Sequence, residues 1–152
     1  MSERASSNQV KQQISALEPA EFDQTAFTAP PPLSEATVAI LTSAALHHPE
    51  QAQFDPRDTS FRKIDPSRRD FRMGHWSQDV DHVGFGVDCN VVFPIDRLNE
   101  LADQGVIGAV SEVHLAYAGN QFEVAGIRMD SGPEGAKVLK DAGVDVVLLT
   151  PV

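Results

Sequence analysis

The stretch "SGPEGAKVLKDAGVDVVLLT", residues 131–150, decides the fold class of this chain. Ser131 or Gly132 can cap the start of a helix, and Gly143 stands where that helix should stop. After a short turn, the apolar run from Val144 to Leu149 predicts a strand of the buried, central kind. A helix, a turn and an apolar strand in this order indicate a parallel sheet with crossover helices.

Further apolar runs supply partners for this helix and strand. The β-branched run Thr37–Leu46 predicts a core strand, Ser60–Ile64 an edge strand, and Ala109–Tyr117 another strand. A helix is expected to begin at Pro94, because the apolar residues after it recur with helical spacing. The stretch Met73–Pro94, rich in glycine, histidine and aspartate, is expected to be loop-like.

These elements predict an α/β fold, a three-layer sandwich with a small, mostly parallel sheet and crossover helices. Residues 1–36 are expected to form a polar leader and a proline-rich segment, with a short helix near Val10–Leu17. Residues 37–152 are expected to form the α/β domain. Because a loop and a covering helix normally follow a strand such as Val144–Leu149, we expect the C-terminal part of this domain to be missing.

Composition and charge disfavour several classes of function. The chain has 152 residues, enough for one domain, and its net charge of −10 argues against nucleic acid as a partner. No apolar stretch approaches the roughly 20 residues that span a bilayer, so no membrane is expected. With Cys89 as its single cysteine the chain forms no internal disulfide, and the cytoplasm is the expected compartment.

Histidines mark the expected site. Ligands of open parallel sheets bind beyond the carboxyl ends of the strands, and His47 and His48 end or follow the first strand. Either imidazole could stabilise a carboxylate substrate as the cation or act as a general acid; the alternative is a satisfied loop histidine. His75 competes for the same substrate-binding role. His114 falls within a strand, where a structural role is expected.

Two polar residues, Asp88 and Asn90, flank Cys89. They either bind substrate or only cap a turn, and the sequence leaves both readings open. Cys89 is either a substitute redox thiol without a cysteine partner or a small buried core residue.

No metal site and no dinucleotide site are predicted. The "GFG" of residues 84–86 lacks the strand and helix context of a nucleotide fingerprint. Several histidines and aspartates could supply metal ligands, but their spacing matches no metal-binding signature. They are His47, His75, Asp79, Asp81 and His82.

Four segments carry a resemblance: "TVAILTSAALHHPE" (37–50), "TSFRKI" (59–64), "GHWSQDVDHVGFGVDCNVVFPIDRLNELADQGVIGAVSEVHLAYAG" (74–119) and "GPEGAKVLKDAGVDVVLLTPV" (132–152). Together they resemble the selenoprotein B family of the glycine, sarcosine, betaine and D-proline reductases, with the D-proline reductase selenoprotein subunit nearest. The resemblance covers most of the chain from about Phe27 onward, and residues 88–108 are its most specific part.

The resemblance implies what should follow Val152. In that family the corresponding strand runs into a redox motif, which is a selenocysteine or cysteine, a second cysteine three positions later and then a histidine. The catalytic nucleophile is therefore expected after Val152. A selenocysteine codon is otherwise a stop codon, so we expect a chain that was read only as far as this codon. Asp88 and Asn90 match the family pattern.

The resemblance also implies a reaction and a partner. A pyruvoyl group on a separate subunit would hold the amine of a small amino acid or related amine. The selenol or thiol would then attack carbon and break the C–N bond, since a selenolate is readily ionised and polarisable. A neighbouring thiol and external dithiols would complete the reduction. The chain is thus expected to be a component of such a reductase and inactive alone.

Other functions stay open. The chain could be a non-catalytic α/β binding or assembly subunit that another polypeptide completes. A racemase-like α/β enzyme is a third alternative, although the sequence lacks the paired cysteines of that chemistry. If a covering helix is missing, apolar sheet surface is exposed, and we expect the isolated chain to be marginally stable, aggregation-prone or held by a partner.

Overall fold

The computed structural model describes residues 28–152 except for Gln78, Asp79, Asp81 and Phe122, together with a few isolated positions nearer the N-terminus. Those positions are Gln12, Ser15, Ala16 and Asp23. The helix expected near Val10–Leu17 therefore lies largely outside the described residues. All statements below concern the described part of the chain.

The centre of the fold is β1 (Thr37–Thr42). It pairs in parallel with β7 (Val146–Thr150) on one edge and, on the other edge, with β5 (Ala109–Val110) and then β6 (His114–Ala116). β3 (Arg62–Ile64) pairs antiparallel with β6 and ends the five-stranded sheet, so the predicted edge strand is confirmed. The sheet is mostly parallel, as the order of helix and strand predicts.

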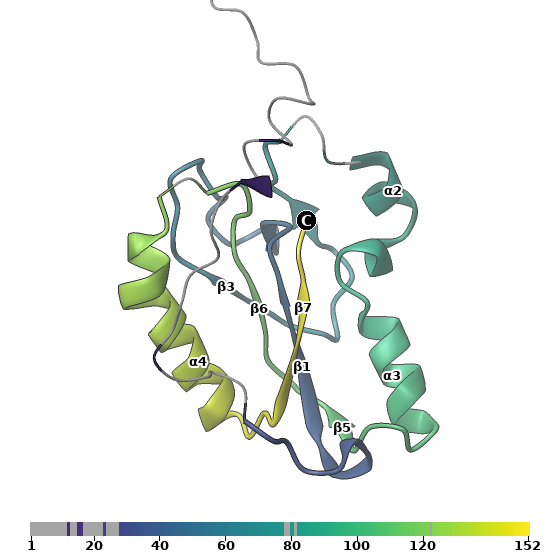
Figure 1. The fold of residues 1–152 in the computed structure, drawn as a ribbon. Helices are drawn as coiled ribbons and strands as arrows, with labels where there is room; N and C mark the ends of the chain where they lie inside the picture. The colour runs from purple at the N-terminus through teal and green to yellow at the C-terminus, as the bar shows by residue number, and fades with distance from the viewer. Residues whose placement is uncertain are drawn as a thin grey trace, which may run out of the picture.

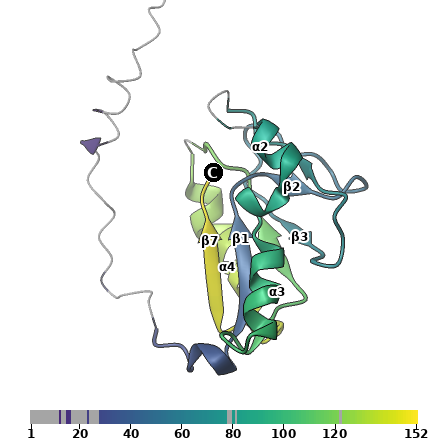
Figure 2. The same ribbon diagram turned by 90° about the vertical axis from the view of Figure 1, so that its right-hand side faces the viewer.

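Helices cover both faces of this sheet. α4 (Gly132–Asp141) lies on one face and α3 (Ile95–Asp103) on the other, which confirms the α/β class (Figures 1 and 2). Both helices are followed by a glycine with φ of 71°, Gly105 after α3 and Gly143 after α4, as their sequences predict. No helix in the described part of the chain is both long and apolar enough to cross a membrane.

A bulge divides the predicted strand Ala109–Tyr117 into β5 and β6. Both parts lie against the same edge of β1, but the chain between them is longer than the stretch of β1 that it passes. Residues 111–113 take up the excess, and the Ser111 hydroxyl accepts the Val113 N–H there at 3.1 Å. The prediction of one continuous strand is therefore wrong, because an apolar pattern does not report the register of a ladder.

His114 has a structural place within the sheet. Its Nδ1 accepts the main-chain N–H of Ile40 at 2.8 Å, where a neighbouring strand would ordinarily offer a carbonyl. The ring is fully buried and stands edge-on to the ring of Phe93, with centroids 5.3 Å apart. Burial lowers the pKa of His114 to about 4, so the imidazole is neutral at physiological pH.

The stretch Met73–Pro94 is more ordered than the predicted loop. It contains or borders three short elements, namely β4 (Arg72–Met73), α2 (His82–Val87) and η2 (Cys89–Val91). β4 pairs antiparallel with β2 (Leu46–His47). The loop prediction is wrong for α2, whose two glycines lower helix propensity and hide the helix from pattern analysis. Two short helical turns, η1 (Leu33–Glu35) and η3 (Ile127–Ser131), were also not predicted.

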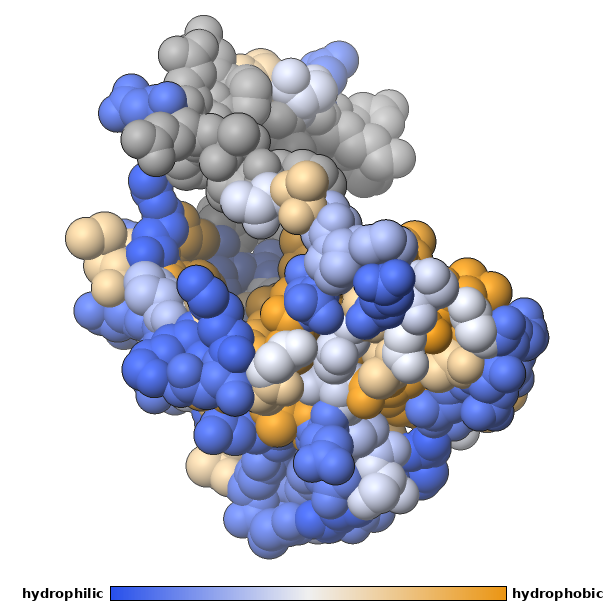
Figure 3. Space-filling view, turned by 90° about the horizontal axis from the view of Figure 1, so that it is seen from below, coloured by the Kyte–Doolittle hydropathy of each residue, from blue (hydrophilic) through white to orange (hydrophobic). Residues whose placement is uncertain are grey.

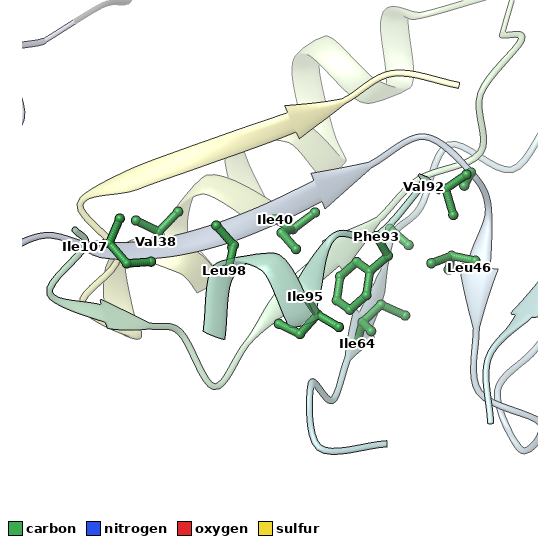
Figure 4. Close-up of a cluster of buried hydrophobic side chains, with 11 residues drawn as sticks. Val38, Ile40, Leu46, Ile64, Val92, Phe93, Ile95, Leu98 and Ile107 are labelled. Atoms are coloured by element: carbon green, nitrogen blue, oxygen red, sulfur yellow. The ribbon is translucent and has the colours of Figure 1, made fainter. Parts of the chain in front are cut away.

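The larger hydrophobic core lies between α3 and the sheet. Phe93, Ile95 and Leu98 pack against Val38 and Ile40 of β1 (Figure 4). Phe93, Ile95 and Ile40 are fully buried, and each such side chain contributes about 1.5–3 kcal/mol relative to exposure. This core attaches α3 to the strand at the centre of the sheet.

A smaller core attaches α4 to the opposite face. Leu139 of α4 packs with Leu115 and Tyr117, and the Tyr117 hydroxyl donates to the Ser131 carbonyl at 2.7 Å. Gly135 makes this approach possible, since a Cβ there would lie only 2.6 Å from the Tyr117 hydroxyl oxygen.

β7 is an edge strand in this structure and not the buried strand that its sequence predicts. Val147, Leu148 and Leu149 are 37%, 38% and 64% exposed, and within the described residues no strand pairs with the outer edge of β7. The opposite edge, β3, carries Arg62 and Lys63, which are the kind of charges that protect sheet edges. Figure 3, a view from below, shows hydrophobic surface between mostly hydrophilic flanks.

Candidate functional site

The carboxyl ends of the central strands meet at Ser43, the residue after β1. The Ser43 N–H donates to the Thr150 carbonyl at the end of β7, at 3.3 Å, and the Ser43 carbonyl accepts the Gly119 N–H at 2.8 Å. The Ser43 hydroxyl accepts the N–H of Val152 at 2.8 Å. These bonds bring the segments after β1, β6 and β7 to one place, the edge where parallel sheets bind ligands.

The backbone at this edge is strained. Ala45 has φ of 54° and Asn120 has φ of 56°, and these are the described non-glycine residues with positive φ. A non-glycine residue in this left-handed region costs roughly 1–2 kcal/mol. Ala45 is held there because its N–H donates to the Tyr117 carbonyl at 2.9 Å and its carbonyl accepts the Gly74 N–H at 3.0 Å. Such strain gathers at functional sites more often than elsewhere.

The same turn explains why the first strand is shorter than predicted. The run Thr37–Leu46 was expected to be one strand, but β1 ends at Thr42 and the chain turns at Ala45 before β2. The turn places His47 in β2, after the carboxyl end of β1, and its role in substrate binding stays a prediction.

His47 is buried with one ring nitrogen unused. It is 3% exposed, and its ring stands edge-on to Phe54 with centroids 6.3 Å apart. Nδ1 lies 3.3 Å from the Ala45 carbonyl oxygen, which can only accept, so the neutral ring carries its proton on Nδ1. Nε2 has no hydrogen-bond partner among the described residues. Neutral His47 therefore presents a free acceptor.

His75 is buried with the opposite tautomer. It is 5% exposed and stacks on Trp76, with centroids 5.8 Å apart and an interplanar angle of 13°. Nδ1 accepts the Ser77 N–H at 3.2 Å, so the neutral ring carries its proton on Nε2. Burial lowers the pKa of His75, the charge of His82 adds to this, and the nearby Val152 backbone opposes the shift.

The Nε2 atom of His75 lies at the meeting point of the strand ends. A Cβ added to Gly119 would lie 2.7 Å from His75 Nε2, 2.8 Å from the Ser43 carbonyl oxygen and 3.0 Å from the main-chain oxygen of Val152. These three groups therefore surround one point, which only a glycine at position 119 leaves free. The structure thus brings His75 to the ends of β1 and β7, a relation that its position in the sequence does not reveal.

His48 makes contacts that hold a neighbouring loop. Its Nε2 accepts the Asp65 N–H at 3.1 Å, and its Nδ1 lies 3.4 Å from an Asp70 carboxylate oxygen. The ring packs on Phe71 with centroids 5.4 Å apart. His48 thus anchors the loop of residues 65–70. These contacts are those expected of a loop histidine with satisfied hydrogen bonds, the alternative given for either of the two adjacent histidines.

Asp88 and Asn90 lie at the start of α3. The Asp88 carboxylate accepts the Asn90 N–H at 2.9 Å and caps η2, and this contact lowers the pKa of Asp88. Asn90 Oδ1 accepts the Asp96 N–H at 3.0 Å, and the Asn90 amide donates to the Asp96 carboxylate at 2.9 Å. Arg69 pairs with the same carboxylate at 2.6 Å. The geometry shows the turn-capping contacts, and substrate binding by Asp88 and Asn90 stays a prediction.

Cys89 is half-buried and lies outside the hydrophobic cores. Burial raises the pKa of its thiol, and the carboxylates of Asp96 and Asp88 raise it further, although Arg69 acts in the opposite direction. A thiol with a raised pKa is a weak nucleophile at neutral pH. Cys89 is therefore neither a buried core residue nor a thiol with a lowered pKa, the two interpretations that the sequence offered.

No cluster of three or more potential metal ligands occurs among the described residues. Asp79 and Asp81, two members of the ligand set considered from the sequence, lie outside the described residues. The described histidines instead have the separate surroundings given above.

A groove of about 690 Å³ opens between α4 and the sheet. One end is formed by Ser43, Gly119 and Val152, the groups that meet His75 Nε2. Its walls are mainly apolar and include Leu139 of α4 and Leu149 of β7. The sequence analysis did not predict this groove. The feature of the sequence that could have indicated the groove is the apolar run of β7, in which alternate residues, Val147 and Leu149, line it.

The fold and site define a class: an α/β protein with a mostly parallel sheet and buried histidines at the carboxyl ends of its strands. Residues 17–152 match the family of the glycine/sarcosine/betaine reductase selenoprotein B. This chain belongs to that family, as the resemblance in its sequence predicts. No solved structure matches the chain.

Two curated relatives support the assignment. The chain is 36% identical over 121 residues to D-proline reductase subunit gamma of Acetoanaerobium sticklandii. The aligned region covers 78% of this chain and 49% of the relative. The chain is 30% identical over 145 residues to glycine reductase complex component B subunit gamma of Carboxydothermus hydrogenoformans. The aligned region covers 86% of this chain and 32% of the relative. The chain thus spans about half the length of the first relative and about a third of the second.

Proposed function

We propose that this chain is the first part of a reductase subunit of the selenoprotein B type, which cleaves a C–N bond with a selenol or thiol placed after Val152. The observation that carries the proposal is the convergence at Ser43. There the end of β7 is bonded to the end of β1 beside the buried His75. A nucleophile on the next residue would lie at the carboxyl edge of the sheet on a rigid mount.

Four buried ring nitrogens have no hydrogen-bond partner among the described residues, and two of them, on His47 and His75, support binding of a small polar substrate. Neutral His75 offers a donor and neutral His47 an acceptor, and both rings are held in place by aromatic contacts. A substrate carboxylate or a developing anion would accept from a donor, and an amine would donate to an acceptor. Asp88 caps η2 and Asn90 accepts the Asp96 N–H in the first turn of α3, so in this proposal both residues hold the start of α3 in place.

The lengths and names of the relatives support a division of labour. Both relatives are named as subunits or components of reductases, and both are longer than the part that this chain matches. We assign the selenocysteine or cysteine pair to the part beyond residue 152. We assign a pyruvoyl group to a separate subunit, where it would hold the substrate amine. The substrate is a small amino acid or related amine, and the expected compartment is the cytoplasm.

A second candidate function is favoured by the edge of β7. An apolar, uncharged edge strand, with Leu149 64% exposed, is suited to pairing with another polypeptide. The chain would then be a non-catalytic assembly subunit that another chain completes. This candidate needs no nucleophile after Val152.

The deciding experiment reads the gene beyond the codon for Val152 and measures the mass of the protein from its source cells. We expect the frame to continue through a selenocysteine or cysteine, a second cysteine and a histidine. The full protein, mixed with a pyruvoyl-containing partner and a dithiol, should then oxidise the dithiol only when substrate is added. A frame without this motif would refute the reductase proposal and favour the assembly subunit. Turnover by residues 1–152 alone would also refute the reductase proposal.

A further inference from the structure

A second hollow lies beside the groove between α4 and the sheet. Its volume is about 360 Å³, and the residues that line it are Pro56, Arg57, Thr59, Gln121 and Glu123. The first three belong to the loop before β3, and the last two to the segment that follows β6. Gln121 also lines the groove, so the two spaces adjoin. Volumes of about 300–1,000 Å³ are typical of sites for small molecules, and the second hollow is at the lower end of this range.

Contacts between the two segments fix the shape of the second hollow. The Gln121 side-chain amide donates to the Asp58 carbonyl at 3.3 Å. The Ser131 hydroxyl donates to the Thr59 carbonyl. Gly126 packs so closely on Thr59 that a Cβ there would lie 2.8 Å from the Thr59 hydroxyl oxygen. Because the two segments are joined at Asp58 and Thr59, the second hollow exists before any ligand binds.

The second hollow carries one positive and one negative side chain. Arg57 and Glu123 both line it, and neither forms an ion pair with another described residue. The Arg57 main-chain N–H donates to the Asp55 carboxylate at 2.8 Å, which holds the backbone of the loop. One Glu123 carboxylate oxygen accepts the Ala125 N–H at 2.9 Å, so the carboxylate is held in place and its second oxygen can accept from a ligand.

Arg57 differs in this respect from the arginines that follow it. Arg62 pairs with Asp58 at 2.7 Å, and Arg68 pairs with Asp70 at 2.5 Å. These two arginines hold their own loops together. The Arg57 guanidinium keeps its donors for another group, and its planar fork of N–H groups fits a carboxylate.

We propose that the second hollow binds the zwitterion of a free α-amino acid, with its carboxylate on Arg57 and its ammonium group on Glu123. The Thr59 hydroxyl offers a further polar contact. A ligand with only one of the two charges leaves the other side chain of the second hollow without a partner, so the site selects molecules that carry both. The inference does not rest on the proposed function, because it needs neither a nucleophile nor a residue after Val152.

The test measures ligand binding to the protein as its gene encodes it, by ¹⁵N NMR signals of the main chain and side chains. The probes are alanine, alaninamide and propionate, which are similar in size and carry both charges, the positive charge alone and the negative charge alone. We expect alanine to shift the signals of Arg57, Thr59 and Gln121 with a millimolar dissociation constant, because exposed charges attract each other weakly. Alaninamide and propionate should bind about fivefold more weakly than alanine.

Two substitutions each remove one charge. Arg57→Gln should weaken alanine binding about fivefold. Glu123→Gln should do the same, although its amide oxygen can still accept the Ala125 N–H. Both side chains are exposed, so both variants should fold. The matched control is Arg97→Gln, which removes an exposed arginine of α3 and should leave binding unchanged.

Three results would overturn the assignment. One is equal binding of alanine by the unsubstituted protein and by the Arg57→Gln and Glu123→Gln variants. Another is equal binding of the three probes. The third is a set of alanine-induced shifts confined to Ser43 and Gly119, which would place the amino acid at the strand ends alone. A gene without a redox motif after Val152 would refute the proposed function and leave this measurement unaffected.

Discussion

Val152 donates its main-chain N–H to the hydroxyl oxygen of Ser43 at 2.8 Å, across 109 positions of sequence. This bond joins the segment after β7 to the residue that follows β1. It therefore positions the end of β7 relative to the buried histidines. Substituting Ser43 tests this contact while leaving every histidine unchanged.

Ser43→Ala should loosen the end of β7 without unfolding the protein. The substitution removes the acceptor for the Val152 N–H, a bond whose net contribution is about 0.5–1.5 kcal/mol. We expect faster amide hydrogen exchange at Val152 and a correspondingly small loss in the free energy of unfolding measured with urea. Ser67→Ala is the matched control, because its hydroxyl bonds only the exposed turn at Asp65. Equal exchange at Val152 in both variants would contradict the role of Ser43.

Gly119→Ala should be poorly tolerated. Its Cβ would lie 2.7 Å from His75 Nε2 and 2.8 Å from the Ser43 carbonyl oxygen, closer than real Cβ contacts allow. We expect a destabilisation of about 1–3 kcal/mol, as for overpacking of a filled site, measured by chemical unfolding. Gly86→Ala is the control, since a Cβ there meets nothing within 4 Å, and alanine is the better helix former within α2. A smaller loss for Gly119→Ala than for Gly86→Ala would show that the strand ends are not closely packed.

Acid should weaken the fold through His114. The folded-state pKa of His114 is lowered to about 4 from the ordinary 6.5, so the unfolded chain binds a proton more readily. The stability that neutral His114 allows is complete above about pH 6.5 and is lost as pH falls toward 4, by about 3 kcal/mol in all. The measurement is the free energy of unfolding in urea at a series of pH values.

His114→Asn separates this effect from other titrations. An asparagine oxygen can accept the Ile40 N–H that Nδ1 of His114 accepts at 2.8 Å, but the amide does not titrate. We expect the variant to be less stable at pH 7, because it packs less well against Phe93, and to lose less stability between pH 6.5 and 4. Identical slopes for the variant and the unsubstituted protein would rule out His114 as the source.

Leu149→Lys should reduce self-association of the 152-residue chain. Leu149 is 64% exposed on an edge strand that carries no charge of its own, and a lysine on such an edge disfavours pairing with other chains. We expect less light scattering on concentration or heating and a nearly unchanged free energy of unfolding. The contrasting variant is Leu139→Lys, which places a charge in the core under α4 and should unfold the protein. Unchanged scattering in Leu149→Lys would argue that β7 is not the associating edge.

Local patterns were sufficient for the elements that make most of their contacts nearby or repeat with a clear period. Residues 131–150 predict α4, its glycine stop and β7 in the correct order, and Pro94 with Gly105 predicts both ends of α3. Helix caps and periodicity act over a few residues, so they are visible without a structure. The same reasoning fails for α2, whose glycines mask the helix, and for Ala109–Tyr117, whose division depends on the register with β1.

The sequence by itself determined the α/β class, the main helices and strands, the family and the histidines worth testing. Tertiary structure alone decided that β7 lies at an edge, that His48 bonds the loop of residues 65–70, and that His75 lies beside the end of β7. The physical reason is that each of these outcomes depends on hydrogen bonds and burial between residues far apart in the chain, such as Ser43 with Val152. Local sequence patterns do not show which residues from distant parts of the chain will meet around one position, as His75, Ser43 and Val152 do around Gly119.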